Sequence, residues 1–391
     1  MIMTEYSKFN GNWNYPTPIR FGVGRLKELA DACRQLSMTK PLLITDPGLA
    51  DLPMTKKALA QNSADGLPTG LFSNIKSNPT GKNVEDGLAV YREGGYDGVI
   101  AFGGGSALDA AKAVALMAGQ KLPLWNFEDV GDNWTRVDPA GVAPIVAVPT
   151  TAGTGSEVGR ASVIVQEESH SKKIIFHPLM LPGIVIADPE TTVGLPPALT
   201  ASTGMDALSH CLEPYSAPGF HPMADGIAVE AIRLIHRWLA VAVKDGSNLE
   251  ARSNMLAAAG MGATAFQKGL GAMHSLAHPL GAIYDAQHGL LNAVLMPYVL
   301  AFNRSVIEDR MTRLAAWLEL PNPSFTAVMD WVLELRSEFN IPATLAGLGI
   351  DDSRVDEIAE MAAVDPSTPT NAIQAGPAEM KKIFLNALNG N

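Results

Sequence analysis

The chain has 391 residues, of which 47% are hydrophobic and 18% are charged, and its formal net charge is −11. This composition is typical of a folded globular protein, and the length favours two domains over one. Because the chain is acidic and has no run of lysines or arginines, nucleic acid and anionic membranes are not expected as partners.

The cysteines and the first residues indicate where the protein works. Cys33 and Cys211 lie far apart and form no CxxC pattern, so neither a disulfide framework nor a cysteine zinc site is expected. Residues 1–18 lack the apolar core of a signal peptide, and no apolar run is long enough to span a membrane. The sequence therefore predicts a cytoplasmic protein.

The first half of the chain alternates short β-branched runs with helical segments. Continuous apolar strands that alternate with helices predict a parallel sheet with both faces covered. We expect a helix over 107–119 and strands within the segments 41–46, 95–106, 143–151 and 183–189.

After about residue 195 the pattern changes to helical spacing with few strand-like runs. Prolines before a helix start make 194–202 a plausible boundary. The predicted fold class is α/β, with an N-terminal Rossmann-like parallel-sheet domain over residues 1–195 and a C-terminal all-helical domain over residues 196–391. Within the second domain, helices are expected over 222–243, 250–267, 305–319 and 325–339.

A glycine cluster separates a predicted strand from a predicted helix. Gly103, Gly104 and Gly105 allow backbone N–H groups to approach a ligand, and Ser106 lies near the helix start. The N-terminus of the helix adds unsatisfied donors and a partial positive charge, which together favour the pyrophosphate of a dinucleotide. The spacing is not GxGxxG, so a tight strand–helix turn without a ligand is the alternative.

Two other loops follow predicted strands and strengthen the nucleotide hypothesis. Thr150, Thr151 and Thr154 can donate to phosphate or ribose oxygens. Asp46 ends the first strong strand, where a carboxylate can accept from a ribose 2′-hydroxyl and repel a 2′-phosphate, which favours NAD over NADP. The alternatives are a hydroxyl-rich loop that satisfies its own backbone and an aspartate that caps a turn.

Acids and imidazoles recur at helical spacing in the second half of the chain. Asp206 and His210 are one helical turn apart, and so are His274 and His278, while His288 follows after a loop that is expected to contain Gly281. One carboxylate with neutral imidazoles is a good ligand set for a divalent transition metal. Spacing does not decide which of the three later histidines is not a ligand, and buried histidines without a metal are the alternative.

The chain resembles the iron-containing (group III) alcohol dehydrogenases over nearly its whole length, in the order as well as the content of its motifs. The motifs GMDALSHCLE and GLGAMHSLAHPLGAIYDAQHG are highly specific to that family. The resemblance rests on FGVGRL (21–26), SNPTGKNV (77–84), GGGSALDAAK (103–112), PTTAGTGSEV (149–158), GMDALSHCLE (204–213) and GLGAMHSLAHPLGAIYDAQHG (269–289).

The resemblance implies a fold like that of dehydroquinate synthase and a role for each matching residue. His278 is implied as an active-site imidazole that is not a metal ligand. The implied metal ligands are Asp206, His210, His274 and His288. The implied NAD contacts are Asp46, Asn78, Gly103, Gly104, Gly105, Ser106, Asp109, Thr150, Thr151, Thr154 and a lysine, for which we choose Lys172, with Lys173 as the alternative.

The implied reaction is hydride transfer between NAD and a short-chain alcohol or carbonyl bound at the metal. Fe(II) is favoured as the metal, with Zn(II) second, and His278 is a candidate for moving a proton to or from solvent. By analogy with the family, the protein is expected to form a dimer or a larger homo-oligomer.

Three residues are candidates for contacts with the substrate. Arg160 and Lys268 are candidate partners for a carboxylate, as in a short hydroxy acid or its semialdehyde, and Phe266 is a candidate for an apolar pocket wall. The alternatives are two solvated cations and a core phenylalanine. A related reductase of the maleylacetate or glycerol dehydrogenase type is the next candidate function, and a metal hydrolase with an incidental glycine loop is a more distant one.

Overall fold

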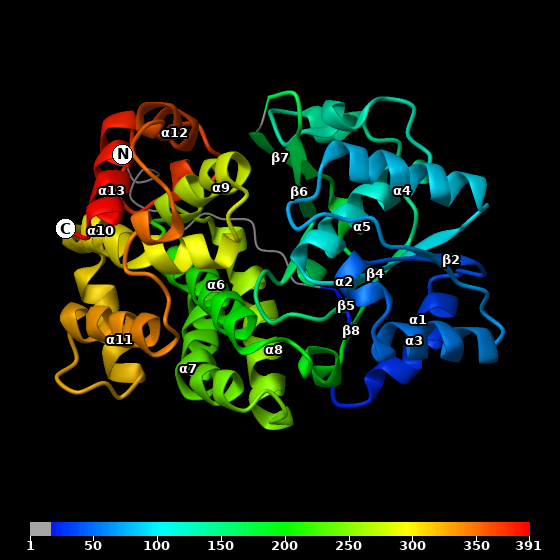
Figure 1. The fold of residues 1–391 in the computed structure, drawn as a ribbon, viewed down its shortest axis with the longest axis horizontal. Helices are drawn as coiled ribbons and strands as arrows, with labels where there is room; N and C mark the ends of the chain where they lie inside the picture. The colour runs from blue at the N-terminus through cyan, green and yellow to red at the C-terminus, as the bar shows by residue number, and fades with distance from the viewer. Residues whose placement is uncertain (1–16, 170) are drawn as a thin grey trace, which may run out of the picture. The chain divides into compact units, whose positions relative to one another are not determined.

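A computed structural model of the protein describes residues 17–169 and 171–391. Residues 1–16, most of the segment in which no signal peptide is expected, lie outside the described residues. The chain forms two compact units (Figure 1). The sheet unit contains residues 17–195 and Ser247–Leu256, and the helical unit contains Pro196–Gly246 and Ala257–Asn391.

The sheet unit is built on six strands that are all parallel. Four of them are buried along their whole length, because alkyl side chains on both faces are covered by helices. In spatial order the strands are β1 (Ile19–Phe21), β8 (Ile184–Ala187), β5 (Ile145–Pro149), β4 (Gly98–Gly103), β2 (Pro41–Ile44) and β3 (Gly70–Phe72).

Helices cover this sheet on both sides, with α4 and α5 on one face and α1 and α3 on the other in Figure 1. An antiparallel hairpin, β6 (Ala161–Gln166) with β7 (Ser171–Phe176), follows the sheet strand β5 in the chain. The α-helices of this unit are α1 (Leu29–Gln35), α2 (Pro47–Ala50), α3 (Pro53–Ala64), α4 (Gly81–Glu93) and α5 (Gly105–Met117).

The predicted strands and the predicted helix of the first half are confirmed, each within a few residues. The sequence did not reveal β1 and β3, because a run of three residues carries almost no periodic signal. It also did not reveal the β6–β7 hairpin.

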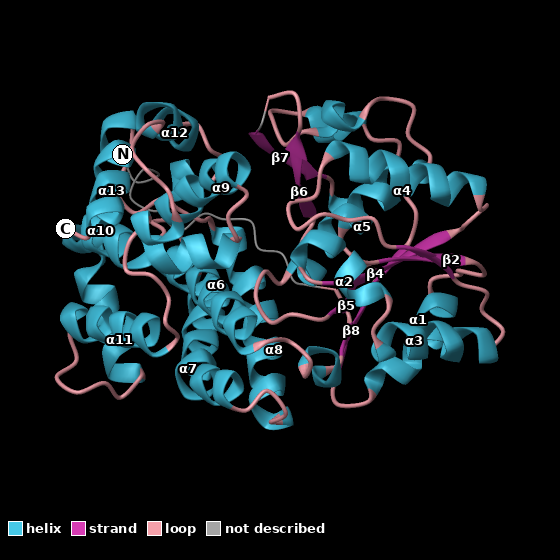
Figure 2. Ribbon diagram, viewed as in Figure 1, coloured by secondary structure: helices cyan, strands magenta, loops and turns pink. Residues whose placement is uncertain are grey.

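The helical unit contains no strand in the residues that the structure describes (Figure 2). The predicted fold class, a parallel-sheet part followed by a helical part, is therefore confirmed, while the domain bounds at residue 195 stay a prediction. The α-helices of the helical unit are α6 (Pro197–Ser216), α7 (Pro222–Lys244), α9 (Ala272–Tyr284), α10 (His288–Trp317), α11 (Phe325–Glu338), α12 (Val355–Ala363) and α13 (Pro377–Asn389). Helix α8 (Leu249–Ala265) begins in the segment that is assigned to the sheet unit and continues into the helical unit.

Two helix boundaries differ from the sequence prediction. The helix expected over 305–319 begins at His288 instead. It contains Pro297, although a proline inside a helix usually ends or kinks it. Gly281 lies inside α9 rather than in the loop before His288, because tertiary packing buries it in a helix that continues to Tyr284. The connecting loop is therefore only residues 285–287.

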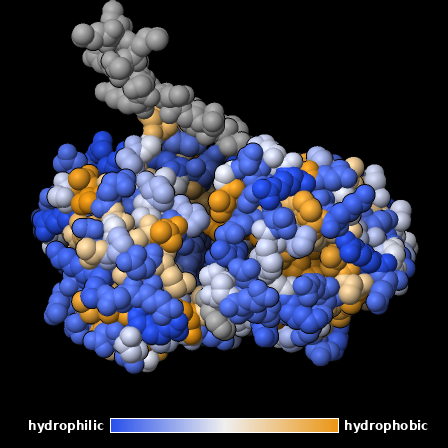
Figure 3. All heavy atoms as spheres, turned by 90° about the horizontal axis from the view of Figure 1, so that it is seen from above, coloured by the Kyte–Doolittle hydropathy of each residue, from blue (hydrophilic) through white to orange (hydrophobic). Residues whose placement is uncertain are grey.

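Helix α10 is long and apolar enough, by length and composition alone, to cross a membrane. Its most apolar window is 61% buried inside the protein, as expected for a core helix. On the face shown in Figure 3, hydrophilic side chains cover most of the surface and hydrophobic ones occur in small groups.

Candidate active site

Three helices of the helical unit bring four potential metal ligands together. Asp206 and His210 lie one turn apart on α6, His274 lies in the first turn of α9, and His288 is the first residue of α10. Each offers one ligand atom, and these atoms all lie within 4.8 Å of one another. Only His288 is not fully buried, so the cluster is largely shielded from water.

The distances in this cluster fit a divalent ion. The Nε2 atoms of His274 and His210 are 3.0 Å apart, a separation compatible with two imidazoles that bind one ion at about 2.1 Å each. His288 Nε2 lies 3.7 Å from Asp206 Oδ1. Asn292 donates from Nδ2 to the same carboxylate oxygen at 2.9 Å. The donor set and its spacing therefore suit an Fe(II) or Zn(II) ion.

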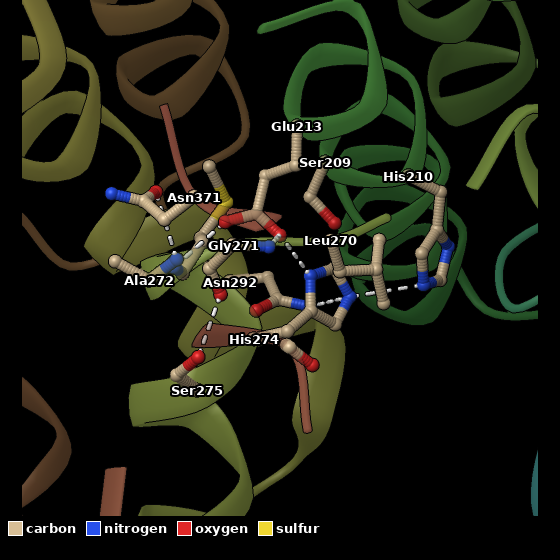
Figure 4. A network of polar contacts seen from close by, with 12 residues as sticks. Ser209, His210, Glu213, Leu270, Gly271, Ala272, His274, Ser275, Asn292 and Asn371 are labelled. Atoms are coloured by element: carbon tan, nitrogen blue, oxygen red, sulfur yellow. Dashed lines mark hydrogen bonds and ion pairs between the residues drawn. The ribbon is translucent and has the colours of Figure 1, made fainter. Parts of the chain in front are cut away.

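Glu213 holds the other side of the His274 ring (Figure 4). Its Oε2 lies 2.6 Å from His274 Nδ1, and both groups are buried. Burial acts to lower the pKa of His274, but nearby carboxylates, Glu213 first and then Asp206 and Asp365, together raise it above its ordinary value. Nδ1 is therefore directed to Glu213, and Nε2 is directed to the cluster.

His278 lies beside the cluster but does not belong to the four-ligand group. Its ring stacks on His288, with centroids 5.6 Å apart and planes 11° apart. Its Nδ1 is 2.8 Å from Asp365 Oδ2. Burial acts to raise the pKa of Asp365, but the contacts with His278 and with Ser367 lower it below its usual range.

In the sheet unit, the glycine cluster joins the end of β4 to the start of α5. Thr150 donates its backbone N–H to the carbonyl of Gly103 at 2.9 Å. A Cβ on Gly105 would lie 2.5 Å from Thr154 Oγ1, closer than such atoms approach. The two loops are thus packed against each other, and the second one requires a residue without a side chain at position 105.

Other predicted cofactor residues lie around the same glycine cluster. Asp46 follows β2, the neighbour of β4, and accepts from the backbone N–H of Leu49 at 3.1 Å. Ser106 donates from its hydroxyl to the carbonyl of Ser77, which places the residue next to Asn78 against the start of α5. Their contacts with a cofactor stay a prediction.

Asp109 has a second, structural set of contacts. One carboxylate oxygen accepts from Ser156 Oγ at 2.5 Å and the other from the backbone N–H of Val163 at 2.9 Å. Lys112 lies 3.2 Å from the first oxygen. Asp109 therefore ties α5 to the loop after β5 and to β6.

This buried group of charges includes two residues that the sequence did not single out. Burial lowers the pKa of the fully buried Lys112. Burial likewise raises the pKa of Glu157 to about 7, although Lys112 opposes the shift. Both residues lie inside motifs that the sequence analysis quoted, Lys112 in 103–112 and Glu157 in 149–158. Nothing in the local sequence shows that they are buried together.

Lys172 and Lys173 are consecutive residues of β7 and therefore point to opposite faces of the hairpin. Lys173 forms an ion pair with Glu128 at 2.9 Å. The choice of Lys172 as the cofactor lysine stays a prediction.

The three candidate substrate residues have different environments. The Phe266 ring lies 5.2 Å from that of His210, beside the ligand cluster. The Lys268 side chain is 1% exposed and pairs with Asp225 at 2.5 Å, so the alternative of a solvated cation was wrong for this residue. Arg160, in the sheet unit, lies over the Phe176 ring at 5.6 Å.

Sequence reasoning did not identify the residues that hold the candidate ligands and His278. Glu213 lies three residues after His210 and Asn292 four residues after His288, so helical spacing could have flagged both. Asp365 gave no such signal, because only the fold brings it to His278.

Two family descriptions match the chain almost end to end. The description "Iron-containing alcohol dehydrogenase" matches residues 16–189, and "Fe-containing alcohol dehydrogenase family, C-terminal" matches residues 200–388.

Several known proteins are similar to this chain over nearly their whole length. The 4-hydroxybutyrate dehydrogenase of Cupriavidus necator is 38% identical over 384 residues, which cover 96% of this chain and 99% of that protein. A crystal structure of a 1,3-propanediol oxidoreductase superposes with a TM-score of 0.91 and 34% identity, covering 97% of this chain and 100% of the other. The sulfoacetaldehyde reductase of Bifidobacterium kashiwanohense, solved in complex with NAD+, has a TM-score of 0.87 and 26% identity, covering 98% and 100%.

Proposed function

The chain belongs to the iron-containing alcohol dehydrogenase family and is an NAD-dependent dehydrogenase, and from this premise we propose that it interconverts a short alcohol and its carbonyl compound at the four-ligand cluster. The observation that carries the proposal is the convergence of four ligand atoms within 4.8 Å. The glycine loop of the sheet unit supplies the matching site for the cofactor.

Asp206, His210, His274 and His288 hold the metal, with Fe(II) favoured by the family and Zn(II) as the second choice. A bound ion supplies Lewis acidity toward the substrate oxygen, and NAD supplies the hydride acceptor. The four side chains keep the donor set fixed from three helices, and the burial of three of them excludes competing water.

The loops of the sheet unit bind and orient the dinucleotide. The N–H groups at the start of α5, at Gly105 and Ser106, would bind the pyrophosphate. Thr150, Thr151 and Thr154 donate to cofactor oxygens, and Asp46 accepts from the ribose and disfavours a 2′-phosphate. Asn78 and Lys172 complete the contacts.

His278 moves the proton that the reaction releases or consumes. The contact of its Nδ1 with Asp365 keeps the proton on that nitrogen and leaves Nε2 as the exchanging atom. Asp365 in turn accepts from the backbone N–H of Ser367 at 2.8 Å, which fixes the orientation of the pair.

The substrate class that we propose is a short ω-hydroxy acid or its semialdehyde. Similarity to a 4-hydroxybutyrate dehydrogenase and to a sulfoacetaldehyde reductase, both named for anionic compounds, supports this choice. Phe266 forms an apolar wall beside His210. Arg160 is the better candidate for the anionic end, because the Lys268 ammonium is already paired with Asp225.

The proposed setting is a reducing cytoplasm, with the chain as a homo-oligomer. Both cysteines are free and buried in the structure, which suits a compartment without disulfides. The oligomer is proposed by analogy with the family alone, and gel filtration with light scattering tests it.

The test of the function is an anaerobic assay of NADH oxidation at 340 nm. The metal is stripped and replaced with Fe(II) or Zn(II), and succinic semialdehyde is compared with butyraldehyde and 3-hydroxypropionaldehyde. We expect turnover only with metal, and a higher kcat/KM for the semialdehyde. Equal values for charged and neutral aldehydes would contradict the substrate class, and turnover without metal would contradict the role of the cluster.

A further inference from the structure

Helix α6 carries a third ionisable side chain, that of Glu213, on the face with the two candidate metal ligands. Asp206, His210 and Glu213 occupy positions 0, 4 and 7 of one helical stripe. Glu213 is buried but lies outside the four-ligand group. A buried carboxylate needs partners, so its contacts indicate what it does.

The contacts of Glu213 all come from the start of α9. One oxygen accepts from the backbone N–H of Gly271 at 2.8 Å and the other from that of Met273 at 2.7 Å. The first oxygen also lies 2.6 Å from His274 Nδ1. Figure 4 shows the Glu213 carboxylate pointing toward the His274 ring and the start of α9.

The start of α9 is fitted to this carboxylate. A Cβ on Gly271 would lie 3.0 Å from Glu213 Oε1 and 2.7 Å from Asn371 Oδ1. That asparagine accepts from the backbone N–H of Ala272 at 3.1 Å. Buried side chains therefore satisfy the first N–H groups of α9, and the same carboxylate sets the position of the helix and of the His274 ring.

These contacts decide the protonation pattern of His274. An ionised carboxylate only accepts hydrogen bonds, so the ring nitrogen that faces it must carry the hydrogen. Nε2 then holds the lone pair, and Nε2 is the atom that lies 3.0 Å from His210 Nε2. A carboxylate behind an imidazole also makes the imidazole a stronger metal donor.

We propose that Glu213 is a positioning residue of the metal site, which holds His274 in the Nδ1–H form and aims Nε2 at the ion. The inference rests on the four-ligand site proposed above. Without Glu213, the ring has a second tautomer and other orientations available, and metal affinity falls by about 10- to 100-fold.

The first test compares Glu213→Gln with a matched control, Asp188→Asn. Asp188 is also buried, and its carboxylate accepts from the backbone N–H groups of Gly24, Leu26 and Glu190, but it contacts no imidazole among the described residues. Zn(II) affinity is measured by competition with a chelator, and melting temperatures of the metal-free proteins are measured alongside. His210→Ala shows whether the measured ion occupies the proposed site.

We expect Glu213→Gln to bind Zn(II) about 10- to 100-fold more weakly than the wild type, and Asp188→Asn to bind it within twofold, although both lose thermal stability. Equal losses of affinity in the two variants, or none in Glu213→Gln, overturn the role of Glu213. If the wild type binds no Zn(II), or if His210→Ala binds it unchanged, the four-ligand site itself fails.

A second measurement keeps the Glu213 carboxylate in place, because it is made on wild-type protein. Wild-type protein with ¹⁵N-labelled histidine is loaded with Zn(II), and the ring nitrogens are observed by long-range ¹H–¹⁵N NMR, with His274→Gln used for assignment. We expect a protonated, hydrogen-bonded Nδ1 and a metal-bound Nε2 for His274. A metal-bound or unprotonated Nδ1 overturns the inference.

Discussion

The two proposed sites of this protein are built from different parts of the chain. In the sheet unit, short loops after β4 and β5 present backbone N–H groups and hydroxyls, and the critical residues have small side chains or none. In the helical unit, long side chains from α6, α9 and α10 converge, and other buried side chains hold them. The first site depends on close backbone approach, and the second on the orientation of side chains.

This difference predicts opposite sensitivities. Adding one Cβ should damage the nucleotide loop and leave metal binding intact, whereas removing one imidazole should do the reverse.

The largest effect is expected for loss of a metal ligand. His274→Gln should lower kcat by about 10³-fold or more, because Lewis-acid stabilisation is worth several kcal/mol. Its matched control is His236→Gln, since His236 lies in the same unit but packs edge-on against Trp331. NADH binding, followed by quenching of tryptophan fluorescence, should be unchanged in both variants. An active metal-free His274→Gln enzyme would contradict the prediction.

The reverse effect is expected in the glycine loop. Gly105→Ala places a Cβ 2.5 Å from Thr154 Oγ1, so the loops must separate and NADH should bind about 10²-fold more weakly. Gly194→Ala is the control, because nothing lies within 4 Å of a Cβ there. The readouts are the dissociation constant of NADH and the Zn(II) content. Unchanged NADH binding in Gly105→Ala would show that the loop does not hold the cofactor.

The buried cation of the helical unit should contribute to stability rather than to substrate binding. Lys268→Met should lower the free energy of unfolding by about 2 kcal/mol, less than for an isolated buried pair, because Arg310 still pairs with Asp225 at 3.3 Å. Lys381→Met breaks an exposed pair and should change it by less than about 1 kcal/mol. Urea unfolding measures both. A raised KM for the semialdehyde alone, without loss of stability, would instead assign Lys268 to the substrate.

The smallest effect is a pH dependence in the sheet unit. The pKa of Glu157 is raised to about 7 from an ordinary 4.5, so its contribution to stability is fully present below pH 4.5 and is lost as the pH rises through about 7. Glu157→Gln removes this loss, and it should gain stability relative to the wild type by on the order of 1 kcal/mol between pH 5 and pH 7. Thermal unfolding at both pH values tests the sign. A relative gain toward low pH would contradict it.

The sequence alone determined the features that depend on local pattern. Apolar strands and helical periodicity predicted the parallel sheet and the later helices, because burial on two faces and burial on one stripe give different spacings. The glycine and threonine loops could be identified because a backbone-built site needs small and hydroxylated residues close together in sequence. Spacing and resemblance also supplied Asp206, His210, His274 and His288 as a ligand set, although spacing left open which later histidine to exclude.

The contacts that each side chain makes depend on the tertiary structure. Packing continued α9 through Gly281 and α10 through Pro297, because the gain from burial outweighs a local helix-breaking preference. Asp365 meets His278 from 87 positions away, and Glu213 meets His274 across 61 positions. Such contacts leave no periodic trace, since they depend on how whole helices pack together. For the same reason, the sequence left a solvated cation open as the alternative for Lys268, whereas the fold buries this residue in an ion pair with Asp225.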